Sequence, residues 1–262
     1  MHIPIQIDEA NIEELLEIIK KESDGLIQCA IKCVYIDTDN EIHRLLNEET
    51  LKRYEAVNKA LKLPLKDFDY DFHQVLGAID EIEEMGRLIQ CWITLGSAVE
   101  TSLQIFLSIY LNDYQKSNWG KWEDFNYEEV KTSLYEVINS LESDGHIIKE
   151  KAKALKKNLK NHLKGKMEVT SLEDMNLQSL VRFFQSEISW DDEYIDALNT
   201  IRENRNAIHS FKNRTVSGWD DLVFSLKFYC ILLLDLQTMM PPFEDVISDM
   251  LQYQADCYRD YY

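Results

Sequence analysis

Residues that interrupt helices are scarce in this chain. Eight Gly and four Pro among 262 residues are too few for the many short strands and tight turns of a β-rich fold. Leu, Glu, Lys and Ile are abundant, and the chain is long enough to bury one large core or a core with an appendage. We therefore predict an all-α protein, a multi-helix bundle.

Apolar residues recur at helical spacing along most of the sequence. Residues 7–24 are predicted as a helix that ends at Gly25, whereas 26–36 suit either a helix or a short strand, with the helix favoured. Residues 41–63 are predicted as one or two helices. Further helices are predicted at about 70–85, 86–114, 127–143, 146–164, 171–187, 190–211 and 218–240.

These elements divide into three predicted parts. An N-terminal helical appendage covers residues 1–64, a helical core covers 65–240, and an acidic, tyrosine-rich C-terminal helix or tail covers 241–262. Pro64 and the pair Pro241–Pro242 mark the two boundaries, because proline ends helices.

Cysteine usage and hydropathy predict a cytoplasmic protein with no membrane span. The five cysteines are odd in number, scattered and mostly set among apolar neighbours, which favours reduced thiols over a disulfide framework. Residues 1–10 lack the pattern of a signal peptide. The most apolar run, 222–236, contains Lys227 and Asp235 and is shorter than the roughly 20 residues of a spanning helix.

Charge is strongly acidic but unevenly distributed. A net charge of −19 argues against broad adhesion to nucleic acid. Residues 149–166 are the exception, with eight Lys and one Glu, or 8 − 1 = +7. RNA could follow this basic helix, although a solvated face that balances acidic neighbours is the commoner explanation of such a run.

No metal site is predicted. Cys29 and Cys33 with His43 lack the second pair of ligands that a structural zinc site requires. Asp67, Asp69 and Asp71 resemble the start of a calcium-binding loop, but the glycine and the final glutamate of that loop are missing.

Two similar helix starts define a predicted αα-hairpin. Ser189 precedes Asp192 by three residues, and Ser217 precedes Asp220 by the same interval, as in capping boxes. The arms of the hairpin are about 190–211 and 218–240, and a short polar loop joins them.

The first arm carries a polar cluster on its apolar side. Its apolar stripe is centred on Leu198, and Arg202, Arg205, Asn206 and His209 lie on the same side of the helix. Inward guanidinium and imidazole groups need partners or a cleft. Because Arg202 and His209 are about 10 Å apart along the helix axis, their side chains could reach one phosphate.

The segment 201–209, Ile-Arg-Glu-Asn-Arg-Asn-Ala-Ile-His, resembles the signature of HEPN domains, a superfamily of helical bundles with many metal-independent RNases. In that family an Arg precedes a His by four to six intervening residues, commonly with a polar residue after the Arg. Arg202 leaves six residues before His209. Arg205 followed by Asn206 is similar to the usual Arg–Asn pair but leaves only three, so either arginine could be the motif arginine.

The resemblance implies an activity and partners. His209 would act as general base or acid for attack of a ribose 2′-hydroxyl on the adjacent phosphate, while Arg202 or Arg205 stabilises the negative charge. It implies an RNA substrate, no metal or cofactor, a homodimer, and a toxin or defence role with a possible protein partner or antitoxin. The alternative from the residues is a non-catalytic acidic helical module that binds a protein.

Glu100 is a further candidate for this site. It lies on the flank of the apolar arc of the predicted helix 86–114 and is expected to be half-buried. A buried carboxylate needs a cation, so we predict that Glu100 orients Arg202, Arg205 or His209. A purely structural ion pair between helices explains the same pattern equally well.

Overall fold

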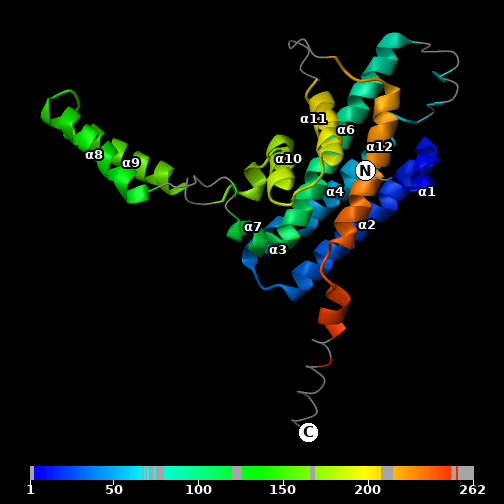
Figure 1. The fold of residues 1–262 in the computed structure, drawn as a ribbon, viewed down its shortest axis with the longest axis horizontal. Helices are drawn as coiled ribbons and strands as arrows, with labels where there is room; N and C mark the ends of the chain where they lie inside the picture. Colours follow the sequence, from blue (N-terminus) through cyan, green and yellow to red (C-terminus); the bar gives the residue numbers. More distant parts are fainter. Residues whose placement is uncertain are drawn as a thin grey trace, which may run out of the picture. The chain divides into compact units, whose positions relative to one another are not determined.

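The computed structural model describes residues 3–66, 68, 70, 73–74, 80–117, 119, 126–165, 169–207, 215–248 and 252. These residues form helices and no strands, so the predicted all-α fold is confirmed (Figure 1). The α-helices of the N-terminal half are α1 Ile5–Asp8, α2 Ile12–Ile36, α3 Asn40–Leu45, α4 Glu48–Ala60 and α6 Glu81–Ile109. The others are α7 Leu111–Lys116, α8 Tyr127–Ser143, α9 Lys149–Gly165, α10 Leu177–Ser186, α11 Asp192–Asn206 and α12 Trp219–Thr238, with a 3-10 turn, η1, at Leu172–Asp174.

The chain divides into two compact units. The first comprises Met1–Tyr110 and Asn176–Tyr262, and the second comprises Leu111–Met175. This division differs from the predicted appendage 1–64 and core 65–240, because α2 packs along α12 and also contacts α4 and α6. Its buried face includes Leu15, Ile19 and Leu26, so the N-terminal helices supply part of the core of the first unit.

Helix α2 passes through Gly25 without a break, so the predicted stop at this residue is wrong and 26–36 is helical. A Cβ atom on Gly25 would lie 2.9 Å from the side-chain amide carbon of Gln237 on α12. The Gln237 amide donates hydrogen bonds to the Glu22 backbone oxygen at 2.9 Å and to Glu22 Oε2 at 2.8 Å. Gly25 therefore permits close contact between α2 and α12.

Helices α6 and α12 lie at the centre of the first unit. A buried hydroxyl network joins them to α4: Tyr54 contacts Ser102 at 2.8 Å, Ser102 contacts Tyr229 at 3.0 Å, and Tyr229 donates to Asn58 at 2.8 Å. Burial raises the pKa of both tyrosines, which keeps them protonated.

Two helical stretches, Glu81–Ile109 and Trp219–Ser248, are long and apolar enough to cross a bilayer. More than half of each apolar segment is buried within the protein. Central helices of soluble bundles have the same property, because they contact other helices on most sides.

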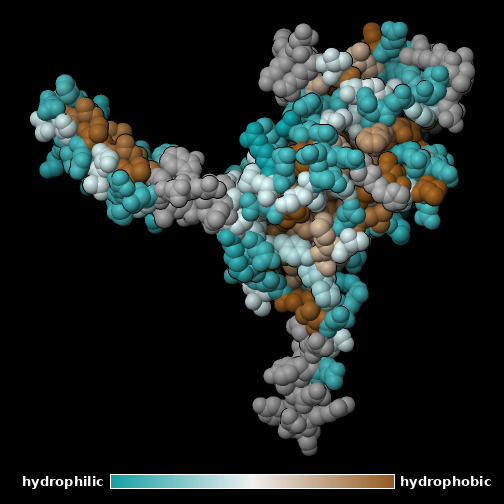
Figure 2. Space-filling view, in the orientation of Figure 1, coloured by the Kyte–Doolittle hydropathy of each residue, from teal (hydrophilic) through white to brown (hydrophobic). Residues whose placement is uncertain are grey.

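The second unit contains an antiparallel hairpin of α8 and α9. Tyr135 Oη donates a hydrogen bond to the Lys156 backbone oxygen at 3.0 Å, which ties the two helices together. Figure 2 shows a row of hydrophobic residues along this hairpin.

Candidate functional site

Helix α11 carries the predicted polar cluster and packs mainly against α6 and α10. It begins at Asp192, where Asp191 Oδ1 accepts a hydrogen bond from the Tyr194 backbone N–H at 2.9 Å. The predicted capping box at Ser189 is therefore wrong, and Ser189 instead adopts a positive φ of 58° before the helix. Asp191 caps as well as serine does, but the sequence analysis considered only Ser189.

Helix α12 also starts differently from the prediction. Its N-cap is Gly218, which has no side chain, so the prediction that Ser217 caps this helix is wrong. Ser217 instead donates its backbone N–H to Asn204 Oδ1 at 2.6 Å, while Asn204 Nδ2 donates to Ser217 Oγ at 3.1 Å. Trp92 Nε1 donates to the Ser217 backbone oxygen at 3.2 Å. The start of α12 is thus fixed to α11 and α6.

Glu100 on α6 pairs with Arg205 on α11. Arg205 Nη1 donates to Glu100 Oε2 at 2.5 Å and Nη2 donates to Oε1 at 3.3 Å. The Leu177 backbone N–H, at the start of α10, donates to the same Oε2 at 2.7 Å. The side chains of Arg205 and Glu100 are only 28% and 19% exposed. The predicted pairing of Glu100 with an inward arginine is present, and this ion pair joins three helices.

Gly96 makes room for this ion pair. It is buried one turn before Glu100 on α6, and a Cβ atom there would lie 2.6 Å from Arg205 Cδ and 2.8 Å from Arg205 Cβ. Any larger residue would displace α11 or the arginine. The sequence analysis did not identify Gly96, because its role depends on a neighbour more than one hundred positions away in the chain.

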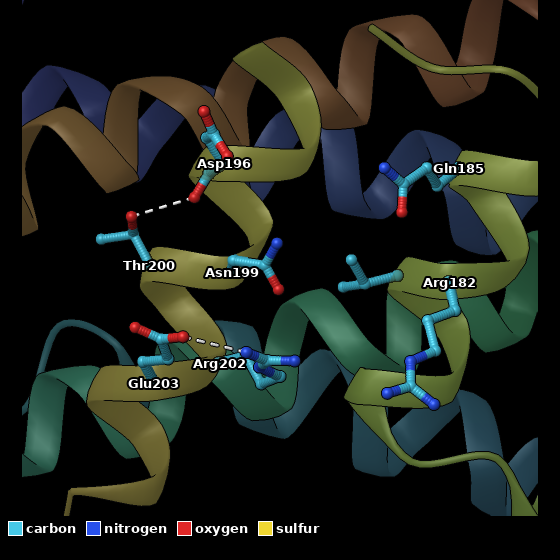
Figure 3. A pocket seen from close by; sticks show the side chains of 8 residues that line it. Arg182, Gln185, Asp196, Asn199, Thr200, Arg202 and Glu203 are labelled. Carbon is cyan, nitrogen blue, oxygen red and sulfur yellow. Dashed lines mark hydrogen bonds and ion pairs between the residues drawn. The ribbon is translucent and has the colours of Figure 1, made fainter. Parts of the chain in front are cut away.

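Arg202 lies apart from this ion pair and lines an open groove of ≈ 550 Å³ between α10 and α11. Its side chain is 21% exposed and its Nη2 donates to Glu203 Oε1 at 3.0 Å. Figure 3 shows Arg182 of α10 on the wall opposite Arg202, with Asn199 above Arg202 on the α11 side and Gln185 above Arg182 on the α10 side. Arg182 and Asn199 did not stand out in the sequence, because each lies on a polar helix face.

The groove combines both signs of charge. Arg182 and Arg202 supply two positive charges, and Asp196 and Glu203 supply two negative charges on the α11 side. Glu203 is 69% exposed, so water screens its pairing with Arg202 and the arginine can exchange partners. An anion can be held between the two guanidinium groups, with amide donors from Asn199 and Gln185 nearby.

Asn206 and His209 are the remaining predicted site residues. Asn206 is the last residue of the helix and is half-buried. His209 falls in 208–214, outside the described residues. Of the other predicted site residues, the structure brings Arg205 and Glu100 together.

Among the described residues, no group of three or more His, Cys, Asp or Glu is arranged to hold a metal ion. Burial raises the pKa of Cys33 to about 11 and that of Cys91 and Cys230 to about 12, so these thiols stay protonated and unreactive at neutral pH. The thiols that the structure describes are free, and Cys257 lies outside the described residues.

Comparison with protein-family models, with curated proteins and with solved structures finds no match to this chain. A functional assignment therefore depends on the residues themselves.

Proposed function

We propose that this chain is a metal-independent endoribonuclease of the HEPN type, in which the groove between α10 and α11 binds the RNA backbone. The observation that carries the proposal is the position of Arg202. It reaches an open groove from a helix whose segment 201–209 resembles the HEPN signature, and Arg182 lies across the same groove. Two guanidinium groups at one groove suit a phosphodiester ligand.

The contacts of the two arginines assign them different roles. Arg205 has both terminal nitrogens committed to Glu100 within the protein, so freeing it for substrate would leave a partly buried carboxylate unpaired. Arg202 has an exposed partner and an open groove. We therefore assign substrate binding to Arg202, which has the Arg-x6-His spacing, and positioning of α11 to Arg205 and Glu100.

The proposed reaction proceeds without a metal. The ribose 2′-oxygen attacks the adjacent phosphorus, the bond from phosphorus to the 5′-oxygen breaks, and the products are a 2′,3′-cyclic phosphate and a 5′-hydroxyl. His209 would take the proton from the 2′-hydroxyl or supply one to the leaving 5′-oxygen. Arg202 would stabilise the negative charge that grows on the phosphate oxygens.

The test is cleavage of mixed RNA substrates by the purified full-length chain in EDTA. We expect His209→Ala and Arg202→Ala each to lower the cleavage rate at least about a hundredfold, since each removes a group that acts in the transition state. Arg53→Ala is the matched control, because Arg53 forms an exposed pair with Glu49 on α4. Circular dichroism establishes that all variants fold.

The ion pair between Glu100 and Arg205 also favours a second function. Glu100 neutralises Arg205 and holds the start of α10, which is what a purely structural junction requires. In that case the chain is a non-catalytic acidic helical module that binds a protein partner. A wild-type chain inert on every RNA tested, or one whose activity survives both His209→Ala and Arg202→Ala, would support this alternative and overturn the nuclease.

A further inference from the structure

The α8–α9 hairpin has more apolar surface than its two helices can bury between them. Along α8, Val130, Leu134, Val137 and Leu141 follow each other at intervals of four, three and four residues. Along α9, a similar series with the same intervals comprises Ile148, just before the helix, and then Ala152, Leu155 and Leu159. Such intervals are typical of helices that pack in coiled-coil fashion.

Much of this apolar series remains accessible to water. No residue of α8 is buried, and on α9 only Ala152 and Leu163 are. Val137 is 56% exposed and Ile148 is 60% exposed; Leu134, Leu141 and Leu155 are also exposed. The row of hydrophobic residues in Figure 2 is this surface. We call these five residues, from α8, the turn and α9, the hairpin face.

The turn between the helices is well formed. Gly145 has a φ of 74°, and His146 donates its backbone N–H to the Leu141 backbone oxygen at 2.9 Å. This is the hydrogen-bond pattern of a helix that ends on a left-handed glycine. The hairpin therefore holds a defined shape while its face is exposed, and two helices without a third layer cannot enclose such a face.

The net charges of α8 and α9 indicate which kind of partner binds the hairpin face. Helix α8 contains one Lys and four Glu, 1 − 4 = −3, and α9 contains seven Lys and one Glu, 7 − 1 = +6. Within 126–165, all of which the structure describes, no ion pair joins α8 to α9. RNA or an anionic membrane that covers the whole hairpin face would be attracted by α9 but repelled by α8, so it would match only one of the two helices. A second hairpin can satisfy both helices.

We propose that the hairpin face binds the same face of a second copy of this chain, forming an antiparallel four-helix bundle. A two-fold axis along the helices places α8 of one protomer against α9 of its partner, so that opposite net charges meet. Pairing α8 with α8 would bring like charges together. The exposed leucine, valine and isoleucine side chains become the core of the bundle.

This proposal is separate from the nuclease. The hairpin face belongs to the second compact unit, and none of its residues lines the groove between α10 and α11. An RNase without this dimer, or this dimer without RNase activity, is a distinguishable result.

The first experiment measures the mass of the full-length chain in solution over a range of concentrations, by sedimentation velocity and light scattering. We expect a dimer that Val137→Glu combined with Leu155→Glu weakens on the order of a hundredfold or more, because both carboxylates would be buried in the bundle core. The control is Ile5→Glu combined with Ile82→Glu, which makes the same change at exposed residues of the other unit and should leave the dimer intact.

The second experiment is a charge exchange that does not depend on a disrupted core. One variant carries Glu129→Lys and Glu136→Lys on α8, which changes the net charge of that helix to 3 − 2 = +1. The other carries Lys151→Glu, Lys153→Glu, Lys157→Glu and Lys160→Glu on α9, which changes its net charge to 3 − 5 = −2. Each alone should dimerise more weakly than the wild type, because like charges then meet across the interface. Mixing the two variants should restore dimers that contain one copy of each.

Four results would overturn the proposal. They are a wild type that is monomeric at every concentration, a dimer indifferent to Val137→Glu and Leu155→Glu, a mixture of the charge variants that associates no better than either alone, and protection of α8 and α9 from hydrogen exchange only when RNA is added.

Discussion

At the scale of single residues, the two glycines of α6 have opposite surroundings. A Cβ atom at Gly96 would collide with Arg205, whereas nothing lies within 4 Å of one at Gly86. We predict that Gly96→Ala destabilises the protein by about 1–3 kcal/mol through overpacking. Gly86→Ala should stabilise it by about 0.5–1 kcal/mol, because alanine favours the helix. Urea unfolding of the two variants measures both effects, and equal midpoints would contradict the role given to Gly96.

Only some of the residues around the ion pair beside Gly96 could be predicted from the sequence. Glu100 and Arg205 were both predictable, because charged groups on apolar helix faces require partners. Gly96, Asn204 and Arg182 were not, because the helix faces that carry them look ordinary until α6, α10 and α11 are brought together. His209 completes the HEPN-like signature, and its contribution to the site stays a prediction.

At the scale of elements, Asn204 fixes the relation between α11 and α12. Its side chain is held by the Thr200 backbone oxygen at 2.9 Å and contacts Ser217 twice. We predict that Asn204→Ala costs about 1–3 kcal/mol, because the Ser217 N–H loses its acceptor in a partly buried position. Thermal unfolding measures the loss. Thr200→Ala, one turn earlier and half-exposed, is the control, and an equal effect of both changes would argue against this function of Asn204.

Helix boundaries show why local sequence signals are insufficient. Gly25 is a common helix terminator, yet α2 continues through it because Gln237 lies against that position. Ser189 and Ser217 both resembled caps, but neighbouring Asp191 and Gly218 occupy the cap positions. That most of the chain is helical could be predicted from apolar periodicity, whereas helix ends depend on tertiary contacts. The predicted boundary at 85–86 lies inside α6, and the predicted helix 86–114 is divided at Tyr110 into α6 and α7.

At the scale of the whole molecule, the two compact units differ in how much of each helix is buried. Helix α6 buries 13 of its 29 residues and α12 buries 11 of its 20, whereas α8 buries none. We predict that amide hydrogen exchange is slowest in α6 and α12 and fastest in α8 and α9 when the chain is dilute. Mass spectrometry of exchanged peptides measures this order. Uniform protection across both units would mean that they unfold as one.

The hydroxyl network of Tyr54, Ser102, Tyr229 and Asn58 has a consequence for how the chain avoids wrong packings. A shift of α4 along α6 by one turn, about 5.4 Å, would keep many apolar contacts. It would also leave several buried polar atoms without hydrogen-bond partners. Alternative alignments of these helices are therefore penalised at one point near the middle of the core. Apolar helices that could otherwise pack in several registers are restricted to one register by this hydroxyl network.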